Sequence, residues 1–569
     1  MVSMTTGMVS MTTGNNESLA KSTIDRRSFI RGAAVLGAVV AIPGLMTACA
    51  PPTTSGGAGT KLLKVGWKSD LDTFNPFTTV TTEAMEILSL MYDNLMHYGV
   101  DLKPEPGLAA ETKAEGNTIT YTLRDGVTWH DGSAFTADDV VFTFDLISKN
   151  KLGSKAQYLT DMTGVTSPDA KTVVVEFSRP QAFDPGLVIP IVPKSIWSVM
   201  SADEISKFAN DAPVGTGPFK FGSWNKGQNA TIDRNDSWWG PKPDAAGVSW
   251  TLYTNDDLQA QALKSGEIDI IPQVPPTIFT GLEGADGIKT VNLDSFSFHH
   301  IGINVSADAN SKGSPLLLDK SIRQALSCAL DRNQIVEIAY AGLAKPGSSL
   351  LPPSFGDFHY EPAAGDVLDN NPDKANQLLD AAGYSTKNSD GIRQTSDGKL
   401  LQFRLIAIST TTVDVRTAQL FAESASKVGI KLDVATLDSD TLGSTVYNTD
   451  GPDWDIFVWG WDSGVNDPNY LLGVPLSSQI GGNNDVFYAD PDYDAMYDKQ
   501  AGELDKAARV ETVLAMQKKF YEDCAYIIPV YLDKLQAYRE DSWTGFQETP
   551  GGIIFNFTRD NFLNAKAGS

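Results

Sequence analysis

Residues that could bind a ligand gather in the stretch Trp454–Tyr470. It carries two tryptophans and, close behind them, four polar residues: Trp459, Trp461, Asp462, Ser463, Asn466 and Asp467. Tryptophan offers a large flat apolar surface with one N–H donor, which suits stacking against a ligand. The chemistry expected here is therefore stacking and hydrogen bonding. The alternative is that both tryptophans belong to a core and close the edge of a sheet.

The position of these residues relative to secondary structure follows from the pattern around them. Asp455–Val458 is a short apolar run with an aromatic residue, which predicts a buried strand. The turn-forming residues Gly460, Ser463 and Asp467-Pro468 predict that the strand ends in a polar loop carrying both tryptophans. Side chains alternate along an extended chain, so Trp459 and Trp461 are expected on one face.

The sequence shows no motif for catalysis or for a metal. Its three cysteines, Cys49, Cys328 and Cys524, form no Cys-x-x-Cys pair. His299 and His300 are adjacent on an expected strand, point to opposite sides and are predicted to be structural. We expect no metal and no cofactor. A secreted polymer hydrolase stays open as an alternative, supported only by the many carboxylates and tryptophans. Cys328 and Cys524 lie in apolar helical contexts, which favours two buried thiols over a disulfide.

Charge excludes one class of partner. The chain of 569 residues has a net charge of −25 and is 41% hydrophobic. Nucleic-acid binding needs clustered Lys and Arg, so it is not expected here. The length suggests two to four domains with sizeable cores.

The first sixty residues are typical of an export signal. Arg26-Arg27 precedes the apolar run Gly32–Ala48, and the pair resembles a twin-arginine signal. The end of the run, Leu45–Cys49, resembles a bacterial lipobox, in which the cysteine becomes the lipidated first residue. We therefore expect a signal over 1–49, a flexible tether over 50–61, and attachment to the outer face of the cell membrane through Cys49.

The rest of the chain predicts mixed α/β structure. A strand is expected over 62–67 and a helix over 82–97, with Phe74 and Asn75 in the loop between them. Thr136–Asp139 is a capping box that opens a helix to Ile147, and Tyr158 follows that helix. Phe403–Ala407, Val413–Val428 and Ile430–Ala435 predict a strand–helix–strand unit.

Several motifs in order resemble one family. The chain is similar to the peptide/nickel-type solute-binding proteins of ABC importers (family 5) over roughly residues 62–545. The motifs that carry the resemblance are Tyr121–Gly132, Thr136–Phe142, Pro213–Phe219, Arg234–Gly240, Ala262–Asp269, Ile322–Arg332 and Ala375–Tyr384.

The resemblance implies a two-lobed α/β fold of the periplasmic-binding-protein type, with an extra α/β insert in the first lobe and a ligand cleft between the lobes. Lobe I is expected over 62–98, 214–300 and 536–569, the insert over 99–213, and lobe II over 301–535. A monomer that delivers its solute to a membrane permease with separate ATPase subunits is implied. By the same resemblance Trp461 contacts the ligand; Phe74, Asn75 and Tyr158 are further cleft candidates.

One departure leaves the ligand open. Peptide binders of this family carry an aspartate three residues after the tryptophan, where this chain has Gly464. A buried ammonium without a partner is costly, so recognition of a peptide amino terminus is not assured. An oligopeptide-sized solute is expected, with an oligosaccharide, an opine or chelated nickel as alternatives. A sensor that signals to a partner would have the same fold.

Overall fold

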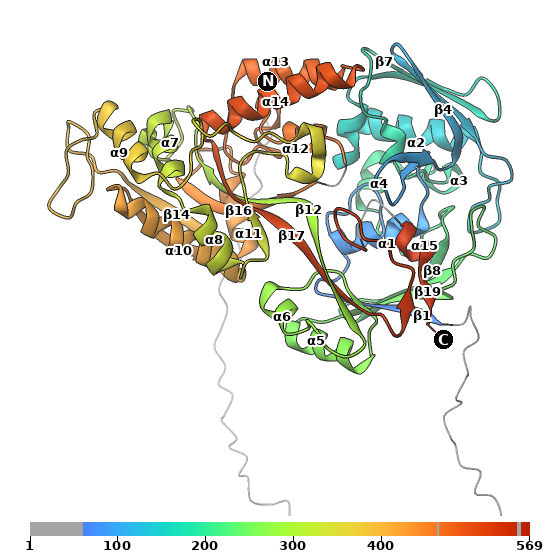
Figure 1. Ribbon diagram of the computed structural model, residues 1–569. Helices are drawn as coiled ribbons and strands as arrows, with labels where there is room; N and C mark the ends of the chain where they lie inside the picture. Colours follow the sequence, from blue (N-terminus) through green and yellow to red (C-terminus); the bar gives the residue numbers. More distant parts are fainter. Residues whose placement is uncertain (1–60, 464–465, 555–558, 569) are drawn as a thin grey trace, which may run out of the picture. The chain divides into compact units, whose positions relative to one another are not determined.

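The computed structural model describes residues 61–463, 466–554 and 559–568 (Figure 1). The expected signal, Cys49, nearly all of the tether, and Gly464 lie outside the described residues. Within the described part, no helix is both long enough and apolar enough to cross a membrane. Cys328 and Cys524 are both buried free thiols, as their apolar contexts predicted.

One large sheet of 11 strands organises the described chain, in the order β15-β14-β16-β12-β17-β11-β1-β10-β9-β8, with β13 beside β17. Its strands are β1 (Leu62–Trp67), β8 (Phe219–Asn225), β9 (Asn229–Arg234), β10 (Gly247–Leu252), β11 (Ile270–Ile271), β12 (Ile288–Ile303), β13 (Ala344–Pro346), β14 (Gln402–Ile408), β15 (Lys431–Leu437), β16 (Ile456–Asp462) and β17 (Tyr526–Arg539). The sheet mixes parallel and antiparallel pairs, and helices pack against it, so the fold is α/β as predicted.

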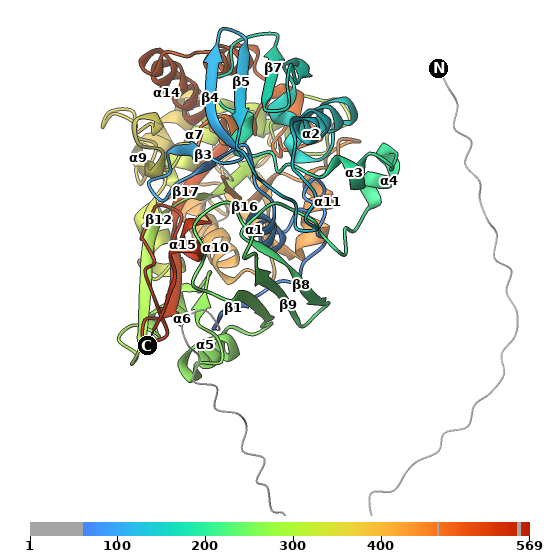
Figure 2. The ribbon, with the colours of Figure 1, turned by 90° about the vertical axis from the view of Figure 1, so that its right-hand side faces the viewer.

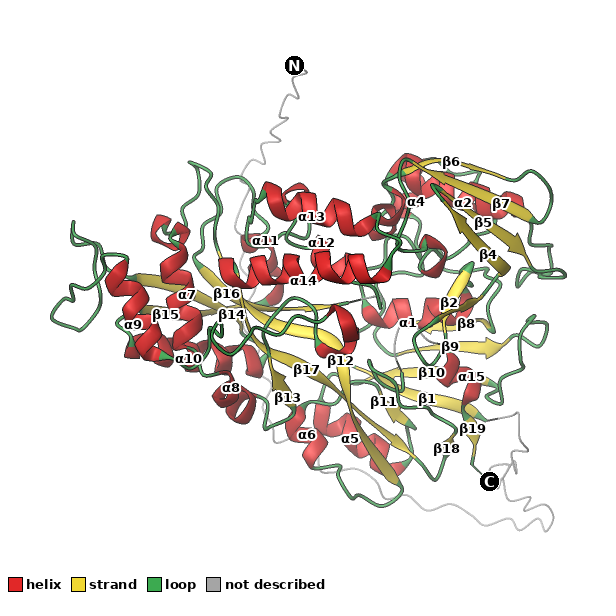
Figure 3. Cartoon of the chain, turned by 45° about the horizontal axis from the view of Figure 1, so that its top comes forward, coloured by secondary structure: helices red, strands yellow, loops and turns green. Residues whose placement is uncertain are grey.

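Two long strands join the two ends of this sheet. β12 and β17 run antiparallel side by side over most of their length (Figures 1 and 3). β12 also pairs with β16, and β17 also pairs with β11. The boundaries expected at 300/301 and 535/536 fall inside these strands, so the connection between lobes is itself part of the sheet. The β12–β17 register shifts between Asp294 and Phe298 and between His299 and Ile301.

The expected strand–helix–strand unit is confirmed. β14 and β15 are parallel and joined by α10 (Thr412–Lys427), because parallel neighbours need a crossover connection. Phe403 and Leu405 of β14 and Phe421 of α10 are buried in one apolar cluster. The sequence pattern placed this unit correctly because the two strands and the helix that form it are consecutive in the chain.

The insert has a sheet of its own, with strand order β4-β5-β7-β6 and α2 (Ala137–Asn150) beside it (Figure 2). Its strands are β4 (Ala109–Glu115), β5 (Thr118–Leu123), β6 (Met162–Thr166) and β7 (Thr172–Phe177). Thr136 caps α2, and the Asp139 carboxylate accepts the Thr136 backbone N–H at 2.9 Å, as the capping-box pattern predicted.

The helix expected over 82–97 is too long in the prediction. α1 (Thr82–Met91) ends at Tyr92, which is extended, and Met96–Tyr98 forms β2. Gly215 and Gly217 pack against this end of the helix. A Cβ on Gly215 would lie 1.9 Å from the Met91 carbonyl oxygen, and a Cβ on Gly217 would lie 2.6 Å from the Leu90 carbonyl oxygen. The tight Gly-Thr-Gly turn therefore packs directly on the last turn of α1.

The remaining elements complete the chain. The other strands are β3 (Pro104–Pro106), β18 (Trp543–Thr544) and β19 (Lys566–Ala567). The other helices are α3 (Lys194–Trp197), α4 (Ala202–Lys207), α5 (Asp256–Ser265), α6 (Pro276–Thr280), α7 (Lys320–Ala329), α8 (Arg332–Ala339), α9 (Pro372–Ala381), α11 (Ser439–Val446), α12 (Asn469–Gly473), α13 (Pro491–Ala501), α14 (Lys506–Asp523) and α15 (Asp560–Asn564). Short 3₁₀ helices are η1 (Ser154–Leu159), η2 (Pro185–Leu187), η3 (Pro315–Leu318), η4 (Pro353–Phe358) and η5 (Ser477–Gln479).

Candidate functional site

The tryptophans lie on a strand, and the prediction that they sit in a loop is wrong. β16 continues through Trp461 to Asp462, and Trp459 and Trp461 pair with His300 and Phe298 of β12. Gly460 misled the prediction because it serves a close contact instead of a turn. A Cβ on Gly460 would lie 2.6 Å from Cδ2 of His299.

Trp461 is half-buried and held in place through its indole N–H. Nε1 donates to Oδ2 of the buried Asp485 at 3.1 Å. The Tyr526 hydroxyl also donates to Asp485. The rings of Trp461 and Tyr470 meet edge-to-face, with their centroids 6.4 Å apart. The ring is therefore fixed by a buried carboxylate while part of its surface stays open.

Trp459 lies on the same face of β16 and is also half-buried. Its ring meets Tyr447 and Phe457 edge-on at 6.2 Å each. It is thus part packing residue and part open surface, which leaves both interpretations made from the sequence in place.

Asp462 ends β16 with an exposed side chain that lines a cavity between β16, β17 and the start of α1. The cavity encloses about 870 Å³ including the part open to solvent. Lys534, Glu83 and Glu86 also line it. Burial by the surrounding protein raises the pKa of Asp462, opposed by the charge of Lys534 and a hydrogen bond from Ser297. Burial also raises the pKa of Glu83, and that of Glu86 to about 7.

The next polar residues of the candidate stretch make internal contacts. The Ser463 side chain is buried, and its backbone N–H donates to the Phe296 carbonyl at 3.1 Å. Asn466 donates to the Leu102 carbonyl at 3.2 Å. Both oxygens of the buried Asp467 accept from Arg509, at 2.8 and 2.9 Å. The carboxylate of Asp467 is therefore already paired in this structure.

Phe74 and Asn75 lie in the core. The Phe74 ring is fully buried against Phe221 and Trp224 at 5.3 Å each. The Asn75 amide donates to two backbone carbonyls at 2.8 and 3.0 Å, and its oxygen accepts the Phe77 N–H at 3.0 Å. That Phe74 and Asn75 contact the ligand stays a prediction. In the structure, Phe74 packs in the core and Asn75 hydrogen-bonds to the backbone.

Tyr158 of η1 is half-buried and packs on Phe183 at 5.3 Å. Burial raises the pKa of its hydroxyl, and Tyr470, Tyr497 and Asp467 raise it further through their charge. Tyr158 therefore faces side chains of the second half of the chain, while Phe74 and Asn75 do not.

Both central histidines have protein partners. Nδ1 of His299 lies 2.8 Å from the Tyr340 hydroxyl and 3.0 Å from Asp414. His300 is fully buried, stacks on Tyr526 at 4.0 Å and lies 3.3 Å from Asp485. They point to opposite faces of β12, as alternation predicted.

One group of side chains in the described part has metal-ligand spacing. The ligand atoms of His97, Glu105 and Asp560 lie within 4.8 Å of one another. Nε2 of His97 is 3.7 Å from Glu105. Burial lowers the pKa of His97 to about 4, and the positive charges of Arg559 and Arg124 contribute to this shift. The same charges oppose a bound cation.

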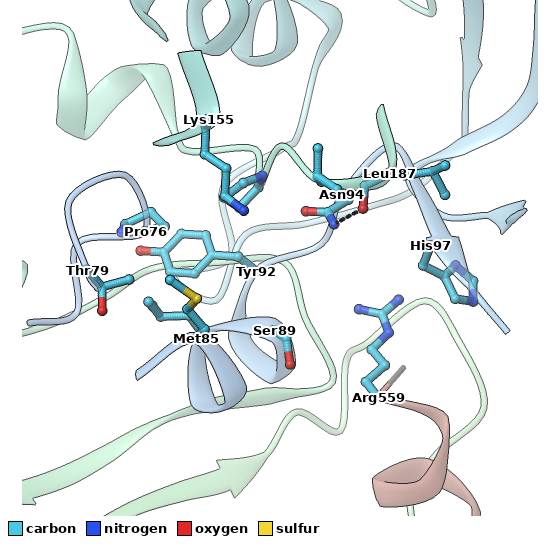
Figure 4. A pocket seen from close by; sticks show the side chains of 13 residues that line it. Pro76, Thr79, Met85, Ser89, Tyr92, Asn94, His97, Lys155, Leu187 and Arg559 are labelled. Carbon is cyan, nitrogen blue, oxygen red and sulfur yellow. Dashed lines mark hydrogen bonds between the residues drawn. The ribbon is translucent and has the colours of Figure 1, made fainter. Parts of the chain in front are cut away.

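The sequence analysis missed a second cavity, on the other side of α1 (Figure 4). Its charged lining residues are Lys155 of η1 and Arg559, which precedes α15. Nothing in the sequence distinguishes Lys155 from a surface lysine; only the fold brings it beside α1.

This geometry defines a class: a two-lobed α/β binding protein with cavities where the lobes and the insert meet. The chain belongs to the bacterial extracellular solute-binding proteins, family 5, whose family model matches residues 103–483. The family resemblance drawn from the motifs is thereby confirmed.

Individual relatives agree with this assignment. The chain is 30% identical to protein XP55 of Streptomyces lividans over 92% of this chain and 93% of XP55. It is 27% identical to the oligopeptide-binding protein AppA of Bacillus subtilis over 87% of this chain and 91% of AppA.

Solved structures share the fold. AppA of B. subtilis in complex with a nonapeptide has a TM-score of 0.75 at 24% identity, covering 90% of this chain and 100% of AppA. NikZ of Campylobacter jejuni in complex with Ni(L-His) has a TM-score of 0.76 at 23% identity, covering 89% and 99%. One fold therefore accommodates a peptide in one protein and a nickel chelate in another, and the ligand must be argued from side chains.

Proposed function

We propose that this protein captures oligopeptides outside the cell and delivers them to the permease of an ABC importer. The oligopeptide-binding relative AppA supports the ligand class. The observation that carries the proposal here is Asp462, an exposed carboxylate at the end of the strand that bears Trp461.

Asp462 can pair with a peptide ammonium although position 464 is a glycine. Its carboxylate lies in a cavity whose other acidic residues, Glu83 and Glu86, repel further negative charge. Burial raises its pKa, whereas the charge of Lys534 lowers it, so a further cation close by would stabilise the carboxylate. A peptide ammonium is such a cation. Asp462 is two positions before Gly464, and as the exposed end of β16 it can supply the missing negative charge.

An oligosaccharide is the second candidate, favoured by the open faces of Trp459 and Trp461 on one side of β16. Stacking on a sugar would use these rings but would give no role to the charge of Asp462. The two candidates therefore differ in what they require of one side chain.

The experiment compares binding of pentaalanine and N-acetyl-pentaalanine by titration calorimetry, after bound solute is removed by unfolding and refolding. We expect Asp462→Asn to weaken binding of the free-amine peptide by about 10- to 100-fold, because a charge-assisted hydrogen bond is lost. Binding of the acetylated peptide should hardly change. Asp450→Asn, at an exposed aspartate, is the matched control. Binding of maltooligosaccharides and of neither peptide would contradict the proposal that the ligand is a peptide.

The proposed protein is a monomeric, non-enzymatic subunit, held at the membrane by a lipid on Cys49 after export by a twin-arginine signal. The lipobox-like Leu45–Cys49 supports this anchor. Detergent phase partition of cell extracts tests it: the parent chain should enter the detergent phase and Cys49→Ala should not. Equal partition of both would contradict lipidation.

A further inference from the structure

The cavity on the far side of α1 has an unusual charge. α1 contributes Met85, Leu88 and Ser89, the segment after η2 contributes Val188 and Pro190, and the whole encloses about 800 Å³ including open solvent. Among the described residues that line it, none is an aspartate or a glutamate. In a chain with 70 acidic and 45 basic residues, a cavity with cations and no lining carboxylate is distinctive.

Lys155 brings a positive charge into this cavity without a counter-charge. Its side chain reaches in above Tyr92 and beside Asn94 (Figure 4). No hydrogen bond or ion pair joins its ammonium to any described residue. Burial lowers the pKa of Lys155 to about 8, so the amine is still mostly protonated at neutral pH. Lys155 is half-buried, and a partly desolvated ammonium gains from pairing with an anion.

Arg559 supplies a second donor at the other end. One of its terminal nitrogens donates to the buried Asp93, which also accepts from Thr216 and Trp239 at 2.9 Å each. Nε of Arg559 is buried and has no hydrogen-bond partner, although the residue is only 7% exposed. Arg559 is therefore already paired with Asp93, and Lys155 is the lining cation for which the described residues supply no partner.

We propose that this cavity binds a carboxylate of the captured solute, with the Lys155 ammonium as its ion-pair partner. The inference rests on the proposed peptide-binding function and refines it. The cavity at Asp462 is lined by three carboxylates and two lysines, whereas this one is lined by Lys155 and Arg559 and by no carboxylate of the described residues. Different faces of α1 line the two cavities: Thr82, Glu83 and Glu86 line the one at Asp462, and Met85, Leu88 and Ser89 line this one. A solute with both an ammonium and a carboxylate would have a partner of opposite charge in each. That carboxylate is either the peptide's carboxyl terminus or an acidic side chain.

The test uses the full chain in detergent, stripped of solute, and three probes: pentaalanine, its carboxyl-terminal amide, and the amide of Ala-Ala-Glu-Ala-Ala. The variants are Lys155→Met, which keeps the length of the side chain, Lys155→Arg, which keeps the charge, and the exposed Lys151→Met as matched control. Urea midpoints of all variants establish that each is folded.

We expect the wild type to prefer a probe with a carboxylate over the plain amide, and Lys155→Met to lose about 10- to 100-fold for that probe only. Lys155→Arg should retain most of the preference. A loss confined to pentaalanine identifies the carboxyl terminus, and a loss confined to the glutamate probe identifies a side chain. If Lys155→Met and the wild type bind all probes alike, the inference is overturned while peptide binding stands. If the wild type binds no probe, the proposed function itself fails.

Discussion

At the scale of single residues, the aspartate that ends β16 and the one that follows it by five residues differ in their partners. Asp462 is exposed and faces a cavity, whereas Asp467 is buried and paired through both oxygens with Arg509. The side chains of Asp467 and Arg509 are only 10% and 8% exposed. We therefore propose that Asp462 contacts the ligand and that Asp467 has a structural role.

This division predicts opposite effects of two similar changes. Asp467→Asn should lower the free energy of unfolding by about 3–5 kcal/mol, because it leaves the Arg509 charge buried without its partner. Asp462→Asn should leave that free energy nearly unchanged. Urea titration followed by circular dichroism measures both. Asp203→Asn, which breaks an exposed pair with Lys207, is the control and should have no measurable effect. A stable Asp467→Asn protein with impaired peptide binding would reverse the assignment.

At the scale of elements, two motifs that lie far apart in the sequence meet around one imidazole. Nδ1 of His130 accepts the Gly215 N–H at 3.1 Å, and Nε2 lies 3.1 Å from the Gly217 carbonyl. The pair satisfies a neutral ring with its proton on Nε2. Burial, with a smaller contribution from the charge of Lys220, lowers the pKa of His130 to about 4, although the Gly217 hydrogen bond, Asp93 and Asp131 raise it.

A pH dependence follows from this contact. The unfolded chain protonates His130 near its ordinary pKa of about 6.5, while the folded protein does so only near 4. The stability contributed by the neutral ring is therefore complete above pH ~6.5 and is lost as pH falls toward about 4. His130→Phe should reduce the slope of stability against pH in this window by at most about 1.4 kcal/mol per pH unit. NMR titration of the His130 ring measures the folded pKa, and a midpoint above pH 6 would refute the argument.

The same elements show what could be predicted from the sequence. The unit from Phe403 to Ala435 was predictable because its strands and helix contact their neighbours in the chain. The position of Trp461 was only partly predictable. Alternation placed it on the same face as Trp459. The sequence could not show, however, whether Gly460 forms a turn or makes room for the ring of His299, because glycine suits both. The position of Lys155 in a cavity was not predictable. The walls of this cavity come from α1 and from Arg559, which are distant from Lys155 in the sequence.

At the scale of the whole molecule, the insert contacts the second half of the chain beside the site. Nε of Arg179 donates to Asp161 within the insert at 2.7 Å, and one Nη donates to the Asp498 carbonyl of α13 at 2.8 Å. The Ala182 N–H donates to the Ala501 carbonyl at 3.0 Å. We expect such contacts, together with the shared strands β12 and β17, to restrain opening of the solute-binding region.

Arg179→Ala should therefore open this region more often. The side chain of Asp498 is 72% exposed, so the pair is worth little, and we expect solute release to quicken by only about two- to fivefold. Stopped-flow tryptophan fluorescence with pentaalanine measures release, provided that Trp461 contacts the solute as proposed. Asp498→Ala tests the partner, but it removes only the carboxylate contact of 3.3 Å and leaves the bond to the carbonyl. Its effect should therefore be smaller than that of Arg179→Ala, and the double change should add little. Equal release rates in the wild type and Arg179→Ala would mean that the insert does not restrain closure, and the β12–β17 strands alone would then set the rate.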